Sequence, residues 1–125
     1  MNQATLVGPD IEGGREFLEL LEQSKVAVTV ALWQSSELPG NWSLVLATPL
    51  VDQIGLKETY RRILNALSKA RPRPPVDLLN VSILAPEGRF MKDLRRELRH
   101  KRNLAIHGRA VGDHVIDNGY IYFVK

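Results

Sequence analysis

The sequence predicts an α+β fold, a single mixed sheet of about five strands with three helices, in the order α-β-β-α-β-α-β-β. Several short runs are rich in β-branched residues and alternate in hydrophobicity, which is typical of strands. Three longer segments carry apolar residues at helical spacing, and two of them lie between strands. The length of 125 residues is that of one ordinary domain, so we expect a single globular domain over 1–125.

The first helix is expected at about residues 10–24. Asp10 is a suitable N-cap, and acidic residues in the first turn suit the helix dipole. Gly13 and Gly14 each weaken the start of this helix by about 1 kcal/mol relative to alanine. We expect this pair to let another backbone segment come close.

Two strands follow the first helix and predict a hairpin. The segment "KVAVTVALW", residues 25–33, alternates and is rich in valine, and "WSLVLATPLV", residues 42–51, resembles it. The intervening "QSSELPGN" contains Pro-Gly and serines, which favour a loop. The two strands should therefore be antiparallel neighbours.

The middle of the chain repeats a strand-loop-helix unit. Helices are expected over 55–70 and 86–101, with a strand over 78–85 between them. The connector "RPRPP" ends the earlier helix, because proline cannot continue it. Each helix can act as a crossover to a parallel strand.

The C-terminal segment 104–125 is expected to be β structure. Gly112-Asp113 and Asn118-Gly119 are both turn signals, and Asn-Gly is the stronger. These signals favour a short meander, and a single hairpin with a bulge at 117–119 is the alternative.

Alternation assigns the strand residues to two faces of the sheet. One face, with Val30 and Leu32 beside Leu44 and Leu46, is expected to be covered by helices. The other carries small and polar residues with three large aromatics, Trp33, Tyr120 and Tyr122. We expect it to be lightly covered, either as a half-solvated face capped by the first helix or as an interface with a second copy or a ligand.

The most basic helix suggests a second binding surface. Its buried side is expected to be Phe90, Met91, Leu94 and Leu98. The opposite side is a stripe of four bases without interleaved acids, Lys92, Arg95, Arg96 and Arg99. Like charges at this spacing cost about 0.2–0.5 kcal/mol per pair, so an anionic partner and an ordinary solvated face both stay open.

Charge is unevenly distributed along the chain, although the net charge is only +3. Residues 9–22 hold five acids and one base, whereas residues 89–102 hold seven bases and two acids. Such asymmetry suggests partners, which would be nucleic acid or an acidic protein surface, including the chain's own first helix.

Enzymatic chemistry has little support in the sequence. Asp52 and Glu87 each lie between a strand and a helix, where carboxylates can hold a divalent ion, so a metal-dependent nuclease is the alternative. The same positions suit a helix cap and a first-turn acid. The three histidines share no face and there is no cysteine, so we expect no metal site and no cofactor.

The remaining sequence features favour an intracellular binding protein. No apolar run approaches the roughly 18 residues of a membrane span, and the N-terminus lacks the pattern of a signal peptide. We therefore expect a cytoplasmic, non-enzymatic binding domain that self-associates and does not contact a membrane.

Overall fold

The computed structural model describes residues 9–35 and 41–125, and its helices and strands follow the expected order. The elements are α1 (Ile11–Gln23), β1 (Val30–Ser35), β2 (Trp42–Ala47), α2 (Leu50–Ile54), α3 (Leu56–Lys69), β3 (Val81–Leu84), α4 (Arg89–Leu98), β4 (Arg102–Val111) and β5 (His114–Val124). A single 3-10 turn, Leu78–Asn80, precedes β3. Residues 36–40 of the expected loop lie outside the described part of the chain.

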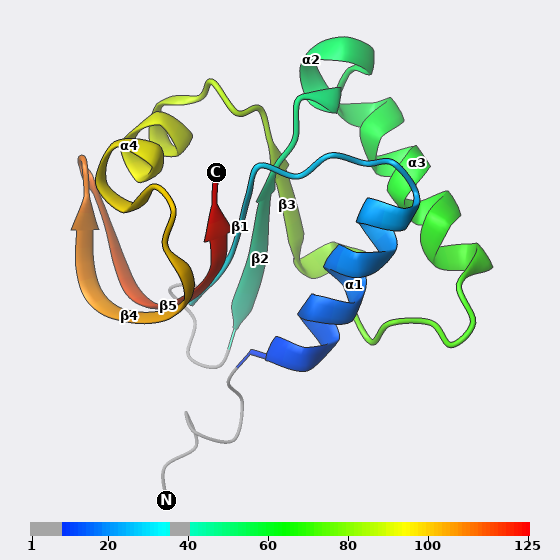
Figure 1. The fold of residues 1–125 in the computed structure, drawn as a ribbon, viewed down its shortest axis with the longest axis horizontal. Coiled ribbons are helices and arrows are strands. Elements are labelled where there is room, and N and C mark those ends of the chain that lie inside the picture. The colour runs from blue at the N-terminus through cyan, green and yellow to red at the C-terminus, as the bar shows by residue number, and fades with distance from the viewer. Residues whose placement is uncertain (1–8, 36–40) are drawn as a thin grey trace, which may run out of the picture.

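The strands form one mixed five-stranded sheet in the order β3-β2-β1-β5-β4, which confirms the predicted fold class (Figure 1). β1 is antiparallel to β2 and to β5, and β4 is antiparallel to β5. The α2–α3 crossover makes β3 parallel to β2, as expected. The second crossover does not: α4 takes the chain from one edge of the sheet to the other, where β4 runs antiparallel to β3.

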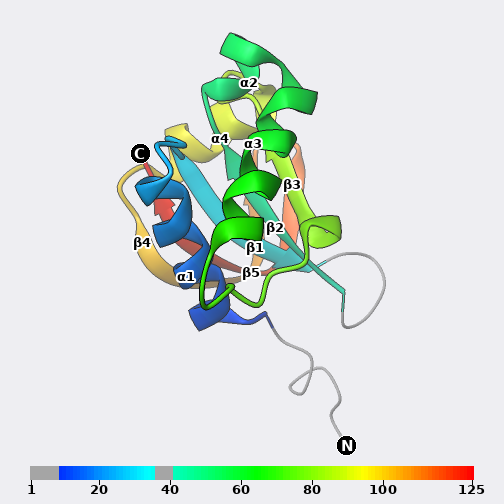
Figure 2. The same ribbon diagram turned by 90° about the vertical axis from the view of Figure 1, so that its right-hand side faces the viewer.

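Both faces of the sheet are covered, by α1 and α3 on one side and by α4 on the other (Figures 1 and 2). The expected grouping of side chains is wrong for β1. Antiparallel pairing places Val30 opposite Ala47 and Leu32 opposite Val45, so these four residues share the face under α4. Alternation within a strand is set by the sequence, but the face that two strands share depends on their register.

The C-terminal strands form a single hairpin, so the favoured meander is wrong, and the alternative is correct in its hairpin but wrong in its bulge at 117–119. The turn is Gly112-Asp113, with Gly112 at a φ of 61°. Asn118 and Gly119 lie inside β5, where Gly119 packs against the carbonyl oxygen of Trp33. The register between β4 and β5 does not shift there; the irregularity lies between β5 and β1, opposite Ala31 and Leu32.

Two element boundaries differ from expectation for local reasons. β1 was expected to begin at residue 25 but begins at Val30. The chain turns out of α1 at Lys25, which has a left-handed φ of 62°, and residues 26–29 link the helix to the sheet. An extra short helix, α2, precedes α3, and Gly55 at a φ of 85° separates the two.

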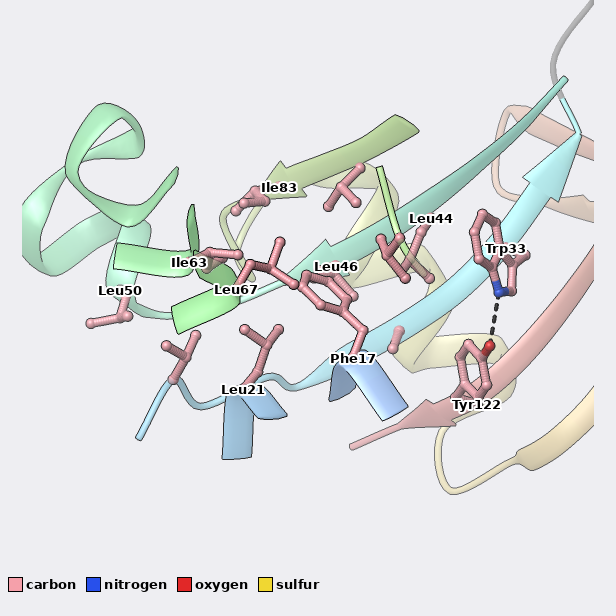
Figure 3. Close-up of a cluster of buried hydrophobic side chains, with 14 residues drawn as sticks. Phe17, Leu21, Trp33, Leu44, Leu46, Leu50, Ile63, Leu67, Ile83 and Tyr122 are labelled. Atoms are coloured by element: carbon pink, nitrogen blue, oxygen red, sulfur yellow. Dashed lines mark hydrogen bonds between the residues drawn. The ribbon is translucent and has the colours of Figure 1, made fainter. Parts of the chain in front are cut away.

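Gly14 allows α1 to lie directly on the sheet, but its close neighbours are side chains and not the backbone segment that was expected. A methyl group there would overlap the hydroxyl of Tyr122 and come within 3.0 Å of Trp33 Nε1. Trp33 Nε1 donates to the Tyr122 hydroxyl at 2.8 Å (Figure 3). The Tyr122 hydroxyl in turn donates to the carbonyl oxygen of Ile11 at 2.7 Å. This chain of hydrogen bonds ties α1 to β1 and β5 inside the core.

The outer edge of β3 is closed by a side chain from α3. Tyr60 donates from its hydroxyl to the carbonyl oxygen of Val81 at 2.9 Å and accepts from the N–H of Ile83 at 3.3 Å. The backbone groups of alternate residues in a strand point to the same side. The carbonyl oxygen of Leu84 accepts from the N–H of Thr48, at the end of β2, so the groups of Val81 and Ile83 point the other way, toward the open edge. The hydroxyl therefore occupies the place of a further strand, which protects the edge from pairing with another chain.

Candidate anion-binding groove

The basic stripe of α4 is largely neutralised by acids within the fold, which sequence spacing did not reveal. Arg96 lies 3.0 Å from Asp93 and 3.5 Å from Glu97. Lys92 and Arg95 both approach Glu87, which lies before the helix, at 4.0 and 3.4 Å. The idea of a stripe without nearby acids is therefore wrong for three of its four members.

Arg95 is the least available base of the stripe. Its side chain is only 16% exposed, and it donates to the carbonyl oxygen of Pro86 at 2.6 Å. Arg95 thus ties α4 to the turn before it. Arg99, the C-cap of α4, is exposed and has no ion-pair partner among the described residues.

The aromatic face is capped by the first helix, as one alternative expected, but it is buried, so the expectation of a lightly covered face or an open interface is wrong. Trp33 and Tyr122 are only 7% and 3% exposed, and both belong to the buried cluster that includes Phe17 of α1 (Figure 3). Tyr120 is half-buried, and its ring meets that of Tyr122 edge-on at 5.3 Å. Burial also raises the pKa of Tyr122 to about 12. These rings belong to the core and leave almost no surface for a second copy.

The two candidate catalytic carboxylates have separate local roles. Asp52 is an exposed residue in the first turn of α2, whose N-cap is Pro49, so Asp52 does not cap a helix. Glu87 precedes α4 and is engaged with Lys92 and Arg95. Over residues 9–35 and 41–125, no group of three His, Asp or Glu side chains could hold one metal ion.

The histidines also have individual surroundings. His107 Nδ1 lies 2.8 Å from Asn118 Oδ1 across the β4–β5 hairpin, and the ring of His114 packs on Phe90 at 4.7 Å. His100 lies in the link between α4 and β4 with a φ of 69°.

A groove of about 690 Å³ lies between α1, the link that follows it, and the neighbouring ends of β4 and β5. Four cationic residues line it, Arg15, Lys25, Arg102 and Lys125, together with two carboxylates, Glu19 and Glu22. Apolar lining comes from residues that include Val26 and Phe123. Its volume is within the usual range for ligand sites.

The two walls of the groove differ in charge. The α1 wall carries Arg15 with Glu19 and Glu22, and Arg15 also lies 3.6 Å from Glu12. Lys25 lies in the link that follows α1, and Arg102 and Lys125 lie at the neighbouring ends of β4 and β5. No carboxylate is paired with those three bases within the described residues. A cluster of like charges that are not paired with counter-charges is suited to an anion.

The polar residues near the mouth are held in place. Asn103, at a left-handed φ of 49°, accepts hydrogen bonds through Oδ1 from Arg15 at 3.1 Å and from the Tyr120 hydroxyl at 3.3 Å. The guanidinium of Arg15 lies 5.5 Å from the centre of the Tyr122 ring, and Lys125 Nζ lies 4.9 Å from that of Phe123. These contacts orient both cations toward the groove.

The residues of the groove were missed by sequence reasoning because they come from three distant segments. Lys25 follows α1, Arg102 begins β4, and Lys125 follows β5. The charge total of residues 89–102 did include Arg102, but helical spacing directed attention to α4 itself. The available signal was Arg102 itself, a base that lies just beyond the expected helix of residues 86–101 and begins β4.

A second, shallower hollow of about 680 Å³ lies between α3 and the connector to β3. Leu64 and Leu79, which line it, are 52% and 91% exposed. Large exposed apolar side chains gathered at one place are typical of protein contact surfaces.

No helix in the described part of the chain is long and apolar enough to cross a membrane. Comparisons with protein-family models, curated proteins and solved structures give no match for this chain.

Proposed function

We propose that this chain is a non-enzymatic binding domain and that it holds a short single-stranded nucleic acid in the groove between α1 and the ends of β4 and β5. The observation that carries the proposal is a set of three bases, Lys25, Arg102 and Lys125, which line this groove beside apolar residues and have no ion-pair partner among the described residues. The expected surface for an anionic partner is therefore this groove and no longer α4, whose bases are mostly paired with acids.

Charge asymmetry favours one orientation of the strand. Phosphates would run along Lys25, Arg102 and Lys125, because Glu19 and Glu22 on the α1 wall repel them. Neutral base edges would then meet the α1 wall, whose carboxylates can accept hydrogen bonds from exocyclic amino groups. A wall of cations beside a wall of acceptors suits a single strand better than a duplex.

The half-buried ring of Phe123 in the groove supports a nucleic acid over a simple anion. Aromatic rings beside a cationic track are the usual means of holding unpaired bases, at about 1–3 kcal/mol per stacked base. Lys125 lies over this ring, so a base would have to share the ring with it or displace it. We therefore expect modest affinity and little preference for sequence.

Fluorescence anisotropy with a labelled mixed-sequence 12-nucleotide single strand, at several salt concentrations, tests the proposal. Three phosphate contacts give a slope of log K against log salt of about −2, since each contact on a single strand contributes about −0.7. Replacing Arg102→Ala together with Lys125→Ala should reduce the magnitude of that slope by about 1.4.

The matched control is Lys92→Ala with Arg96→Ala on α4. It removes the same two charges, but from side chains already paired with Glu87 and Asp93, so binding should change little. If both double variants lose the same affinity, binding depends on the overall charge of the protein and not on the groove, which contradicts the proposal. Binding of a poly-glutamate peptide in place of the oligonucleotide would show an acidic protein segment to be the partner.

A further inference from the structure

The connector between α3 and β3 presents an apolar projection beside an apolar hollow. Leu79, at 91% exposure, is the most exposed large apolar residue of the described chain. The hollow next to it is lined by Leu64 of α3 and by the connector, residues 73–79. In Figure 2 this connector leaves the lower end of α3 and turns back toward β3.

Local hydrogen bonds hold Leu79 in this outward position. The Asp77 side chain accepts from the N–H of Leu79 at 3.0 Å, and the Asp77 carbonyl accepts from the N–H of Asn80 at 2.8 Å. The N–H of Val76 bonds to the carbonyl oxygen of Pro74 at 2.9 Å. With two prolines in the wall, the projection and the hollow are both fixed before any partner arrives, which lowers the entropic cost of binding.

Charges on the rim of the hollow are of opposite sign and are unpaired with each other. Arg73 and Asp77 are both exposed, both line the hollow, and neither has an ion-pair partner among the described residues. A two-fold axis through the hollow would place Arg73 of one copy near Asp77 of the other, and the reverse. The rim is thus complementary to itself.

We propose that this surface joins two copies of the chain in a two-fold dimer, in which Leu79 of each copy enters the hollow beside Leu64 of the other. An isologous contact requires one patch to carry both the inserting and the receiving feature, and this patch carries both. The proposal differs in residues and in partner from the groove. It also moves self-association away from Trp33 and Tyr122, which are buried under α1.

Sedimentation velocity over a range of protein concentrations, up to several hundred micromolar, measures the association. The native chain should dimerise, and Leu79→Asp should raise the dimer dissociation constant by about 100-fold or more, because two leucines per dimer lose their burial. Leu64→Asp provides a second variant with the same expected direction. The control is Leu56→Asp, which removes a leucine that is 47% exposed but does not line the hollow, and it should leave the dimer intact.

A charge exchange tests the two-fold geometry. Arg73→Asp and Asp77→Arg should each weaken the dimer alone, whereas an equal mixture of the two variants should form heterodimers. Circular dichroism melting checks that each variant is folded. A native chain that stays monomeric at the highest concentration would overturn the proposal. So would a dimer that survives both leucine variants, because the contact would then lie elsewhere.

Discussion

Replacing Tyr122 by phenylalanine should destabilise the protein far more than the loss of one exposed hydroxyl would. The Tyr122 hydroxyl accepts a hydrogen bond from Trp33 Nε1 at 2.8 Å and donates one to the Ile11 carbonyl oxygen at 2.7 Å, and Tyr122 is 3% exposed. Phenylalanine fills nearly the same space, so the change acts mainly through hydrogen bonding.

The magnitude follows from what each partner loses. Trp33 Nε1 would become a buried donor without an acceptor, which costs about 1–3 kcal/mol. The carbonyl oxygen of Ile11 also accepts the α-helical hydrogen bond from the N–H four residues later. It therefore keeps one partner in the variant, and its loss of hydrogen-bond energy is smaller. We expect a loss of about 2–3 kcal/mol in the free energy of unfolding, and a fall in Tm of about 8–12 °C.

Urea denaturation and calorimetric melting measure this loss, with Tyr120→Phe as the matched control. The Tyr120 hydroxyl donates at 3.3 Å to exposed Asn103, so its removal should cost less than about 1 kcal/mol. If the two variants lose the same stability, the hydrogen-bonded link between α1 and the sheet has no special energetic role and the reasoning is refuted.

Three further predictions concern the same packing and the β3 edge. Gly14→Ala should lower stability by about 1–3 kcal/mol through overlap with Tyr122, although helix propensity alone predicts a gain, and a higher Tm would contradict this. Burial raises the pKa of Tyr122 from an ordinary 10 to about 12, so the unfolded chain loses this proton at a lower pH than the folded chain. The free energy of unfolding should therefore fall between pH 10 and pH 12, by up to about 1.4 kcal/mol per pH unit. Melting curves across that range measure this loss, and Tyr122→Phe should remove it. Tyr60→Phe should speed amide exchange at Ile83 and cost about 1 kcal/mol, and unchanged exchange would show that the edge is closed by something else.

Local patterns in the sequence predicted most of the fold. Asp10 caps α1 as expected, with its carboxylate accepting from the N–H of Gly13 at 2.8 Å. The glycine pair marks a close approach, although by side chains and not by the expected backbone segment. Propensity and spacing act over a few residues, so they identify helices, strands and turns well. Pairing between strands depends on residues that are far apart in the sequence. The predictions that depend on it were wrong: the face on which Val30 lies, the direction of β4, and the position of the last turn.

The candidate site was harder to predict, because charge pairing depends on tertiary contacts. Glu87 precedes α4 and still neutralises Arg95 two turns into the helix, which a helical wheel cannot represent. Trp33 and Tyr122 were correctly placed on one face of the sheet, but the sequence did not show how closely α1 would cover that face. Arg102 begins β4 and Lys125 follows β5, so they are far apart in the sequence. The antiparallel pairing of β4 with β5 brings both residues to the same end of the hairpin, beside the groove.

The salt-dependent titration with a single-stranded oligonucleotide tests the functional account most directly. Binding should be measurable at low salt, with a slope of log K against log salt of about −2. Arg102→Ala with Lys125→Ala should reduce the slope to about −0.6, whereas Lys92→Ala with Arg96→Ala should leave it nearly unchanged. Absence of binding at low salt, or an equal effect of the two double variants, would contradict it.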